Sequence, residues 1–183
     1  TSGNLSHRLG DRMLITPSAV APHAMTPRMI CAMPLSGDPA AWEGPKRPSS
    51  EWRFHRDILN ARPDVHAVVH THAMHCTALA MARRGIPAVH YMIALFGGPD
   101  VRCAPYARFG SQALSDAAVA ALRERMACLL ANHGMIVVGP TLPRAMFLAV
   151  ELEVLAEQYL HLLKIGGGAV LSELPVHVPP SAE

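Results

Sequence analysis

The sequence predicts an α/β fold in which a mixed or antiparallel central β-sheet is covered by helices in three layers. Half of the 183 residues are hydrophobic and only 16% are charged, which suits one large core. Short β-branched runs alternate with runs of helical periodicity, which favours one sheet with helices on its faces. Because no internal repeat or change of composition divides the chain, we assign residues 1–183 to a single domain. The chain begins at Thr1 in a turn-rich run, and we expect an N-terminal segment to precede it.

Three kinds of sequence signal place the elements along the chain. Alternating or β-branched apolar runs predict strands, serine before a helical period predicts a helix start, and glycine after one predicts a helix end. Ser49 and Ser50 mark such a start, with Glu51 in the first turn. The predicted elements are a turn-rich run at 1–6, two short antiparallel strands before Pro17, strands at 29–33, 65–71, 88–94, 128–131 and 135–138, and helices at 50–61, 73–84, 111–125 and 142–165.

Composition argues against several classes of protein. Sixteen Lys and Arg residues against fourteen Asp and Glu give a net charge of +2 without a dense basic cluster, so nucleic acid is not an expected partner. No apolar run reaches the ~18 to 20 residues that cross a bilayer, and we expect no membrane segment and a cytoplasmic location. Four widely spaced cysteines without a CxxC motif predict reduced, buried thiols. Lys46 and Lys164 are the only lysines, and neither position favours a Schiff base.

The placement of the eleven histidines is the most informative feature of the sequence. His70 and His72 share one face of a predicted strand, roughly 7 Å apart at ~3.3 Å per residue, so both could reach one cation. A catalytic zinc site usually needs a third protein ligand and an open position. His133, in a glycine-flanked turn between two short strands, is the best candidate, and His75 and His90 are rivals. The alternative is that these histidines form ordinary hydrogen bonds.

Two segments have the pattern of an anion site. The helix start at Ser49, Ser50 and Glu51 offers free backbone N–H groups and the positive end of the helix dipole, so the two serines could hold a phosphate. Residues 1–4 form a similar turn with exposed amides. A plain helix cap and a plain turn have the same patterns, and both alternatives stay open at this point.

Seven segments, in the same order, resemble one known family. They are TSGNLS, LITPS, PSSEWRFH, DVHAVVHTHAMHCTALA, IPAVHYMIALFGG, RCAPYARFG and LLANHG. Together they cover nearly the whole chain and resemble the class II aldolase/adducin family, most closely its branch that cleaves L-fuculose 1-phosphate. The resemblance implies a zinc-dependent lyase with one Zn²⁺ per subunit. It would reversibly cleave a ketose 1-phosphate, a small sugar phosphate, into dihydroxyacetone phosphate and an aldehyde.

The resemblance also implies roles for single residues. His70, His72 and His133 match the zinc ligands. Glu51 matches an acid/base carboxylate that also contacts zinc in the substrate-free state. Tyr91 matches a tyrosine that a neighbouring subunit contributes, which implies a homotetramer with active sites at its subunit interfaces. The residues that match the phosphate pocket are Gly3, Asn4, Thr16, Ser49 and Ser50.

The implied chemistry is consistent with these residue types. Breaking the C3–C4 bond leaves negative charge on an enediolate, which a zinc ion bound to its two oxygens stabilises as a Lewis acid. Tyr91 suits removal of the C4 hydroxyl proton. Glu51 suits protonation of C3, with its pKa raised once the site closes. Neutral donors at a helix N-terminus can hold the phosphate, so the small net charge is no objection.

Departures from the family pattern leave the substrate open. Ala19 stands where relatives usually have glycine, and no tyrosine follows Tyr159, where relatives often carry one that closes over the aldehyde. Methylthioribulose 1-phosphate and 5-deoxyribulose 1-phosphate are therefore alternative substrates. Further alternatives are a sugar-phosphate 4-epimerase, a dehydratase or a decarboxylase of the same superfamily. The non-catalytic adducin branch lacks the metal histidines that this chain carries.

Overall fold

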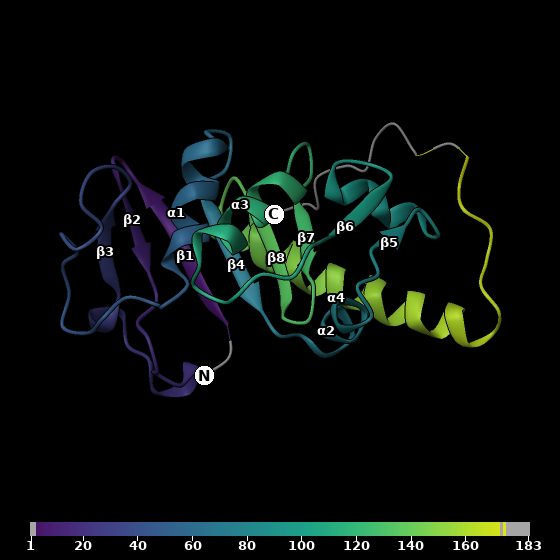
Figure 1. Cartoon of the computed structure of the whole chain (residues 1–183), viewed down its shortest axis with the longest axis horizontal. Helices are drawn as coiled ribbons and strands as arrows, with labels where there is room; N and C mark the ends of the chain where they lie inside the picture. The colour runs from purple at the N-terminus through teal and green to yellow at the C-terminus, as the bar shows by residue number, and fades with distance from the viewer. Residues whose placement is uncertain (1–2, 173, 175–183) are drawn as a thin grey trace.

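One eight-stranded sheet organises residues 3–172 and 174, the part of the chain that the computed structural model describes (Figure 1). The strand order is β3-β2-β1-β4-β8-β7-β6-β5. Neighbours are antiparallel except β6 and β7, which are parallel. The predicted mixed sheet is confirmed. The strands are β1 (Asn4–Leu9), β2 (Arg12–Ile15), β3 (Cys31–Pro34), β4 (Ala67–Thr71), β5 (Ile86–Pro87), β6 (Asp100–Ala104), β7 (Ala127–Leu130) and β8 (Gly134–Gly139).

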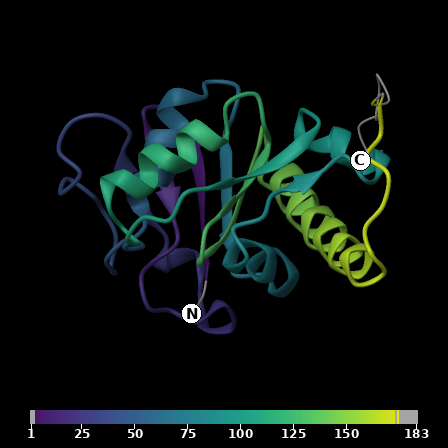
Figure 2. The same ribbon diagram turned by 45° about the vertical axis from the view of Figure 1, so that its right-hand side comes forward.

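Helices cover both faces of this sheet and complete the three predicted layers (Figure 2). On one face lie α1 (Trp52–Ala61) and α3 (Gln112–Ala121), and on the other lie α2 (Met74–Met81) and α4 (Leu142–Lys164). Among the described residues, no helix is both long enough and apolar enough to cross a membrane. Short 3₁₀ helices complete the elements: η1 (Pro22–Ala24), η2 (Pro27–Met29) and η3 (Tyr91–Phe96).

The alternation of β4 divides its side chains between two hydrophobic cores. Ala67 and Val69 pack in the core under α2 and α4, whereas Val68 packs in the core under α1 and α3. His70 is on the same side as Val68, and its ring lies 5.4 Å from that of Phe54 of α1, centroid to centroid. The strand therefore directs His70 toward the start of α1.

Two regions near the β5 edge of the sheet differ from their predicted structure. The range 88–94 was predicted as a strand, but β5 stops at Pro87 and η3 follows, starting where the His90 ring accepts a hydrogen bond from the backbone N–H of Met92. Periodicity does not separate a short apolar strand from a short helix, which explains the error. β6 was not predicted, because Asp100 and Arg102 interrupt its apolar pattern.

Two boundaries near the N-terminus also differ from the prediction. β1 begins at Asn4, inside the range predicted as turn, and pairs with both β2 and β4. Residues 1–2, which belong to the predicted anion-binding turn, lie outside the described residues, as do residues 175–183. At α1, Glu51 is the N-cap residue and not part of the first turn, and no side chain caps the helix. The Glu51 side chain is therefore available for other contacts.

Candidate metal centre and adjoining pockets

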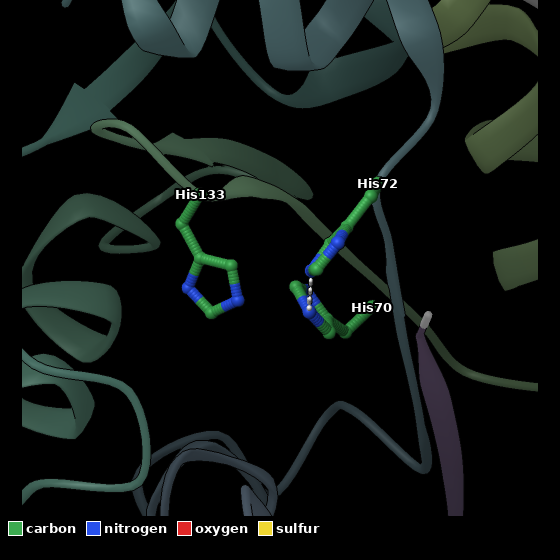
Figure 3. A group of neighbouring side chains, drawn as sticks. All are labelled: His70, His72 and His133. Atoms are coloured by element: carbon green, nitrogen blue, oxygen red, sulfur yellow. Dashed lines mark hydrogen bonds between the residues drawn. The ribbon is translucent and has the colours of Figure 1, made fainter. Parts of the chain in front are cut away.

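Three histidines meet at the end of β4 (Figure 3). His70 belongs to β4 and His72 follows it, so strand alternation places both rings on one face. His133, from the turn between β7 and β8, faces them. The ring centroids are 4.8 to 5.0 Å apart in each pair, and one ring nitrogen of each histidine lies within 4.8 Å of the others. The predicted cluster is therefore present in the fold.

The turn that carries His133 fits only because glycine follows it. A Cβ at Gly134 would lie 2.5 Å from the carbonyl oxygen of Thr71 and 2.9 Å from Cδ2 of His72. Before His133, Asn132 has a φ of 56°, a left-handed conformation that asparagine tolerates better than most residues. Its Oδ1 accepts a hydrogen bond from Arg83 Nε at 3.1 Å. These local constraints hold His133 against the end of β4.

Glu51 reaches into the cluster from the start of α1. Its Oε2 lies 3.3 Å from His70 Nε2 and accepts a hydrogen bond from Asn4 Nδ2 at 2.9 Å. Its Oε1 lies 3.2 Å from His133 Nε2 but receives no well-directed hydrogen bond, although the atom is buried. A buried carboxylate oxygen without a donor is unfavourable. A cation among these groups would satisfy it.

The hydrogen bond on the far side of His70 sets which nitrogen faces the cluster. Nδ1 of His70 lies 2.9 Å from the carbonyl oxygen of Met135, so Nδ1 carries the proton. The lone pair of Nε2 then points into the cluster, where Nε2 of His72 lies 3.1 Å away. Two ring nitrogens at this distance need a proton or a cation between them. Three imidazoles with this backbone support form a set of ligands that fits zinc.

The electrostatics of the cluster favour the protonation states that bind metal. Burial raises the pKa of Glu51, but the contacts with His133, His70 and Asn4 outweigh it and hold the pKa well below its ordinary value. Glu51 is therefore ionised in the open site, and the predicted rise of its pKa concerns the closed site with substrate. Burial, followed by the charges of His70 and His133, lowers the pKa of His72. A neutral imidazole is the metal-binding form.

A cavity of about 480 Å³ opens beside His70 and His72. It brings together the predicted phosphate residues, although their hydroxyls are not equally free. Thr16 Oγ1 already accepts a hydrogen bond from the backbone N–H of Leu5 at 3.1 Å. Ser18, which sequence reasoning missed, also lines this cavity, and its signal is the hydroxyl two residues after Thr16 in LITPS. The predicted residues that line the cavity are Gly3, Asn4, Thr16, Ser49, Ser50 and Glu51.

Gly3 is required by both space and conformation at the edge of this cavity. Its φ is +94°, and a Cβ there would lie 2.7 Å from the carbonyl oxygen of His70. The backbone at Gly3 therefore lies directly against the end of β4. Next to it, Asn4 pairs in register with His70 across β1 and β4, which places the Asn4 side chain beside Glu51.

A second cavity of about 320 Å³ also adjoins the cluster. It shares Glu51, His72 and His133 with the cluster and adds the exposed rings of Tyr106 and Phe109. Sequence reasoning missed these two aromatic residues, and only the conspicuous segment RCAPYARFG marked their position. The histidines thus lie at the junction of two cavities.

Three residues singled out in the sequence lie away from the cluster. Tyr91 is 55% exposed in η3 and lines neither cavity of its own chain. His75, a rival third ligand, lies on α2, and its Nδ1 is 2.9 Å from Glu153 Oε1. His90, the other rival, caps η3. Neither rival joins the cluster.

Comparisons with known proteins agree with this geometry. The family described as Class II Aldolase and Adducin N-terminal domain matches residues 1–160. A 5-methylthioribulose-1-phosphate/5-deoxyribulose-1-phosphate aldolase from Rhodospirillum rubrum is 54% identical over 171 residues, which cover 93% of this chain and 76% of that protein. The L-fuculose phosphate aldolase of Escherichia coli strain K12 is 48% identical over 165 residues, 90% of this chain and 75% of that protein.

Solved structures have the same fold. An L-fuculose 1-phosphate aldolase matches with a TM-score of 0.89 and 37% identity, over 94% of this chain and 81% of that one. The L-fuculose-1-phosphate aldolase from Thermus thermophilus matches with a TM-score of 0.77 and 29% identity, over 93% of this chain and 88% of that one. These matches confirm the predicted fold and the predicted lyase class. The chain belongs to the class II aldolase/adducin family, whose aldolases are generally metal-dependent.

Proposed function

We propose that this protein is a zinc-dependent aldolase that reversibly cleaves a ketose 1-phosphate into dihydroxyacetone phosphate and an aldehyde. One observation carries the proposal: three histidine nitrogens and an ionised carboxylate lie where a hydroxyl-lined cavity meets an aromatic one. His70, His72 and His133 would hold the zinc ion. When bound, zinc supplies a Lewis acid for the negative charge that C3–C4 cleavage leaves on the three-carbon phosphate fragment.

The larger cavity suits the phosphate arm of the substrate. Ser49 and Ser50 precede α1, whose N-terminus supplies positive potential for an anion. Gly3 brings backbone to the same wall, and Asn4 Nδ2 adds a side-chain donor. All these groups are neutral, so the phosphate is held by directed hydrogen bonds and not by a basic cluster.

Glu51 and Tyr91 would act as the general acid and base. Glu51 lies beside two of the proposed metal ligands and lines both cavities, so it can carry a proton to or from C3. Tyr91 is exposed on its own subunit, which supports a role in the site of a neighbouring subunit, where its side chain, as the phenolate, would take the C4 hydroxyl proton and become the phenol. The Tyr91 assignment therefore requires an oligomer.

A cytoplasmic homotetramer is part of the proposal. Apolar side chains at Met146, Val150 and Val154 of α4 are more than 40% exposed, as is the ring of Tyr91, and such groups are typical of buried subunit contacts. The four cysteines are free, with Cys31, Cys76 and Cys128 buried, which supports a reducing compartment.

The second cavity suits an aldehyde with an apolar end. Tyr106 and Phe109 are its aromatic walls, and Gly3 and Asn4, which line the larger cavity, do not line it. Cleavage of L-fuculose 1-phosphate, 5-deoxyribulose 1-phosphate or methylthioribulose 1-phosphate releases a small aldehyde that ends in a methyl or methylthio group. The two rings fit all three aldehydes.

A coupled assay of dihydroxyacetone phosphate release tests the proposal on these three substrates. It is run with and without a chelator, on the wild type and on Glu51→Gln. We expect chelator-sensitive release from at least one substrate, and loss of release in the variant. No release from any substrate by the zinc-loaded, assembled protein would overturn the aldolase assignment. The proposed activity would then be that of an epimerase, a dehydratase or a decarboxylase of the same superfamily.

A further inference from the structure

A fully buried histidine of α1 lies outside the metal cluster and is connected to it through Asn4. His55 has no exposed surface, and its ring stacks on that of Phe54 with centroids 4.6 Å apart. Its Nδ1 lies 2.7 Å from Ser6 Oγ, and its Nε2 lies 2.5 Å from Asn4 Oδ1. The other end of the same amide, Asn4 Nδ2, donates to Glu51 Oε2 at 2.9 Å.

The direction of each hydrogen bond in this chain follows from the chemistry of the groups. The amide oxygen of Asn4 can only accept, so Nε2 of His55 carries the proton. Nδ1 then has a free lone pair and accepts from the hydroxyl of Ser6. Burial, followed by the charge of His70, lowers the pKa of His55 to about 3 despite the opposing charge of Glu51, so the ring stays neutral. Every donor in this series of hydrogen bonds therefore points toward the Glu51 carboxylate.

This direction decides which end of the Asn4 amide faces the site. If the amide were flipped, its oxygen would face the ionised Glu51, which is unfavourable, and His55 would have to carry its proton on Nδ1 to accept from the NH₂ group. With His55 in the Nε2–H form, the NH₂ group faces Glu51 at the wall of the larger cavity. One of its two N–H bonds goes to Glu51, and the other can point to a ligand.

We propose that His55 is a positioning residue: its Nε2–H donates to Asn4 Oδ1 and fixes the Asn4 amide with its NH₂ group toward Glu51 and the sugar phosphate. The hydroxyl of Ser6 pairs with the other ring nitrogen. The inference rests on the proposed function, because binding of the phosphate by Asn4 belongs to that function. His55 itself touches neither the substrate nor the metal. Its effect on catalysis therefore passes through Asn4.

Two substitutions separate the hydrogen bonds of His55 from its packing. His55→Phe keeps an aromatic ring against Phe54 but removes the donor and the acceptor, whereas His55→Gln keeps one of each. We expect His55→Phe to raise KM for the ketose 1-phosphate roughly tenfold to a hundredfold, with a smaller change in kcat. We expect His55→Gln to stay within about threefold of the wild type. A defect in His55→Gln as large as that in His55→Phe, or larger, would show that restoring a donor and an acceptor does not restore binding, and would overturn the proposal.

A double-mutant cycle with Asn4→Ala tests whether the effect passes through Asn4. In that background we expect His55→Phe to change KM less than about twofold, because the amide that it positions is gone. Independent, multiplying effects would show a merely structural role and would overturn the inference. Ile58→Val is the matched control, because Ile58 is buried on the same helix but belongs to no part of this chain of hydrogen bonds. Its KM should equal that of the wild type.

A spectroscopic readout needs no turnover. Nitrogen-15 shifts of His55 should show a protonated Nε2 and an unprotonated Nδ1 throughout pH 5 to 8, and an Nδ1–H form would overturn the inference. If the wild type released no dihydroxyacetone phosphate, the proposed function would fail by itself. The same cycle would then be measured as affinity for inorganic phosphate, with the same expectations for each variant.

Discussion

Glu51 and Glu153 both contact histidines closely, and they do so for different reasons. Glu51 lies beside His70 and His133, and its buried Oε1 receives no well-directed hydrogen bond. Glu153 of α4 accepts from the backbone N–H of His75 at 2.8 Å and of Cys76 at 3.0 Å, and its Oε1 lies 2.9 Å from His75 Nδ1. The residue types are the same. The unmet hydrogen-bonding capacity at Glu51 is the difference.

Each carboxylate lies at the N-terminus of a helix, which sharpens the contrast. The N-cap residue of α2 is Ala73, whose side chain cannot cap, and Glu153 from α4 takes over that task for two backbone N–H groups. Glu51 is itself the N-cap residue of α1, yet its side chain turns away from the helix toward the histidines. Satisfied groups stabilise the fold, and the carboxylate left unsatisfied is the one available for chemistry.

Loss of a proposed metal ligand should produce the largest effect that separates the surroundings of Glu51 from those of Glu153. His133→Ala should lower zinc affinity more than about a hundredfold and abolish activity, since even residues that only support metal ligands contribute about 10- to 100-fold. His75→Ala should leave both unchanged, because Glu153 already satisfies that ring. Metal analysis and zinc titration of the chelator-treated protein measure this. More than one zinc ion per wild-type chain would contradict this contrast, because Glu153 and His75 could then bind metal as well.

Removal of the charge on each carboxylate gives the next largest effect. Glu51→Gln should lower kcat about 10²- to 10⁴-fold, the usual contribution of a general acid or base. Zinc should remain bound, because the three histidines are intact. Glu153→Gln should stay within about twofold of the wild-type rate. Steady-state kinetics with zinc content measured in parallel checks this. A similar loss of rate in both variants would contradict the distinction between a catalytic Glu51 and a structural Glu153.

Glu153→Gln, which should hardly change the rate, should instead lower the stability of the fold. Glu153→Gln weakens two backbone contacts at the start of α2, and we expect about 1 kcal/mol lower free energy of unfolding at pH 7. Hydrogen bonds to charged groups contribute about 1.5–3 kcal/mol, but the Glu153 side chain is 25% exposed, and solvent screening reduces the effect. Urea unfolding of both proteins measures it. Unchanged stability would mean that Glu153 does not cap α2.

The contribution of Glu153 should also depend on pH. Burial raises its pKa, but the N–H groups of His75 and Cys76 and their side chains outweigh burial, and the net pKa is lowered. A lowered pKa in the folded state means that ionised Glu153 stabilises the protein above the unfolded value of about 4.3, and that this stability is lost as pH falls through the folded value. The stability gap between the wild type and Glu153→Gln should therefore narrow below about pH 4.3. A gap that is constant between pH 7 and pH 3 would contradict this.

Sequence reasoning located the features that depend on near neighbours. Strand alternation placed His70 and His72 on one face, and the glycine after His133 marked its turn, because both depend on a few adjacent residues. Apart from the histidine cluster and the phosphate pocket, which the family resemblance implied, contacts between distant segments were not predicted. Ser6 and His55 are 49 positions apart, and His75 and Glu153 are 78 apart. Nothing in the local pattern around either member of such a pair names its partner.

The smallest expected effect concerns the rim of the larger cavity. Ala19, which lines this cavity, has a φ of 59°, in the left-handed region that favours glycine. That conformation costs alanine about 1–2 kcal/mol, whereas glycine costs about 0.4–1 kcal/mol through the entropy of the unfolded chain. Ala19→Gly should therefore stabilise the protein by about 0.5 kcal/mol and leave zinc affinity unchanged. Ala40→Gly, at an exposed alanine that does not have a positive φ, should instead lower stability. If both variants lose stability in urea unfolding, the conformation at Ala19 carries no strain, and the alanine there is neutral for the fold.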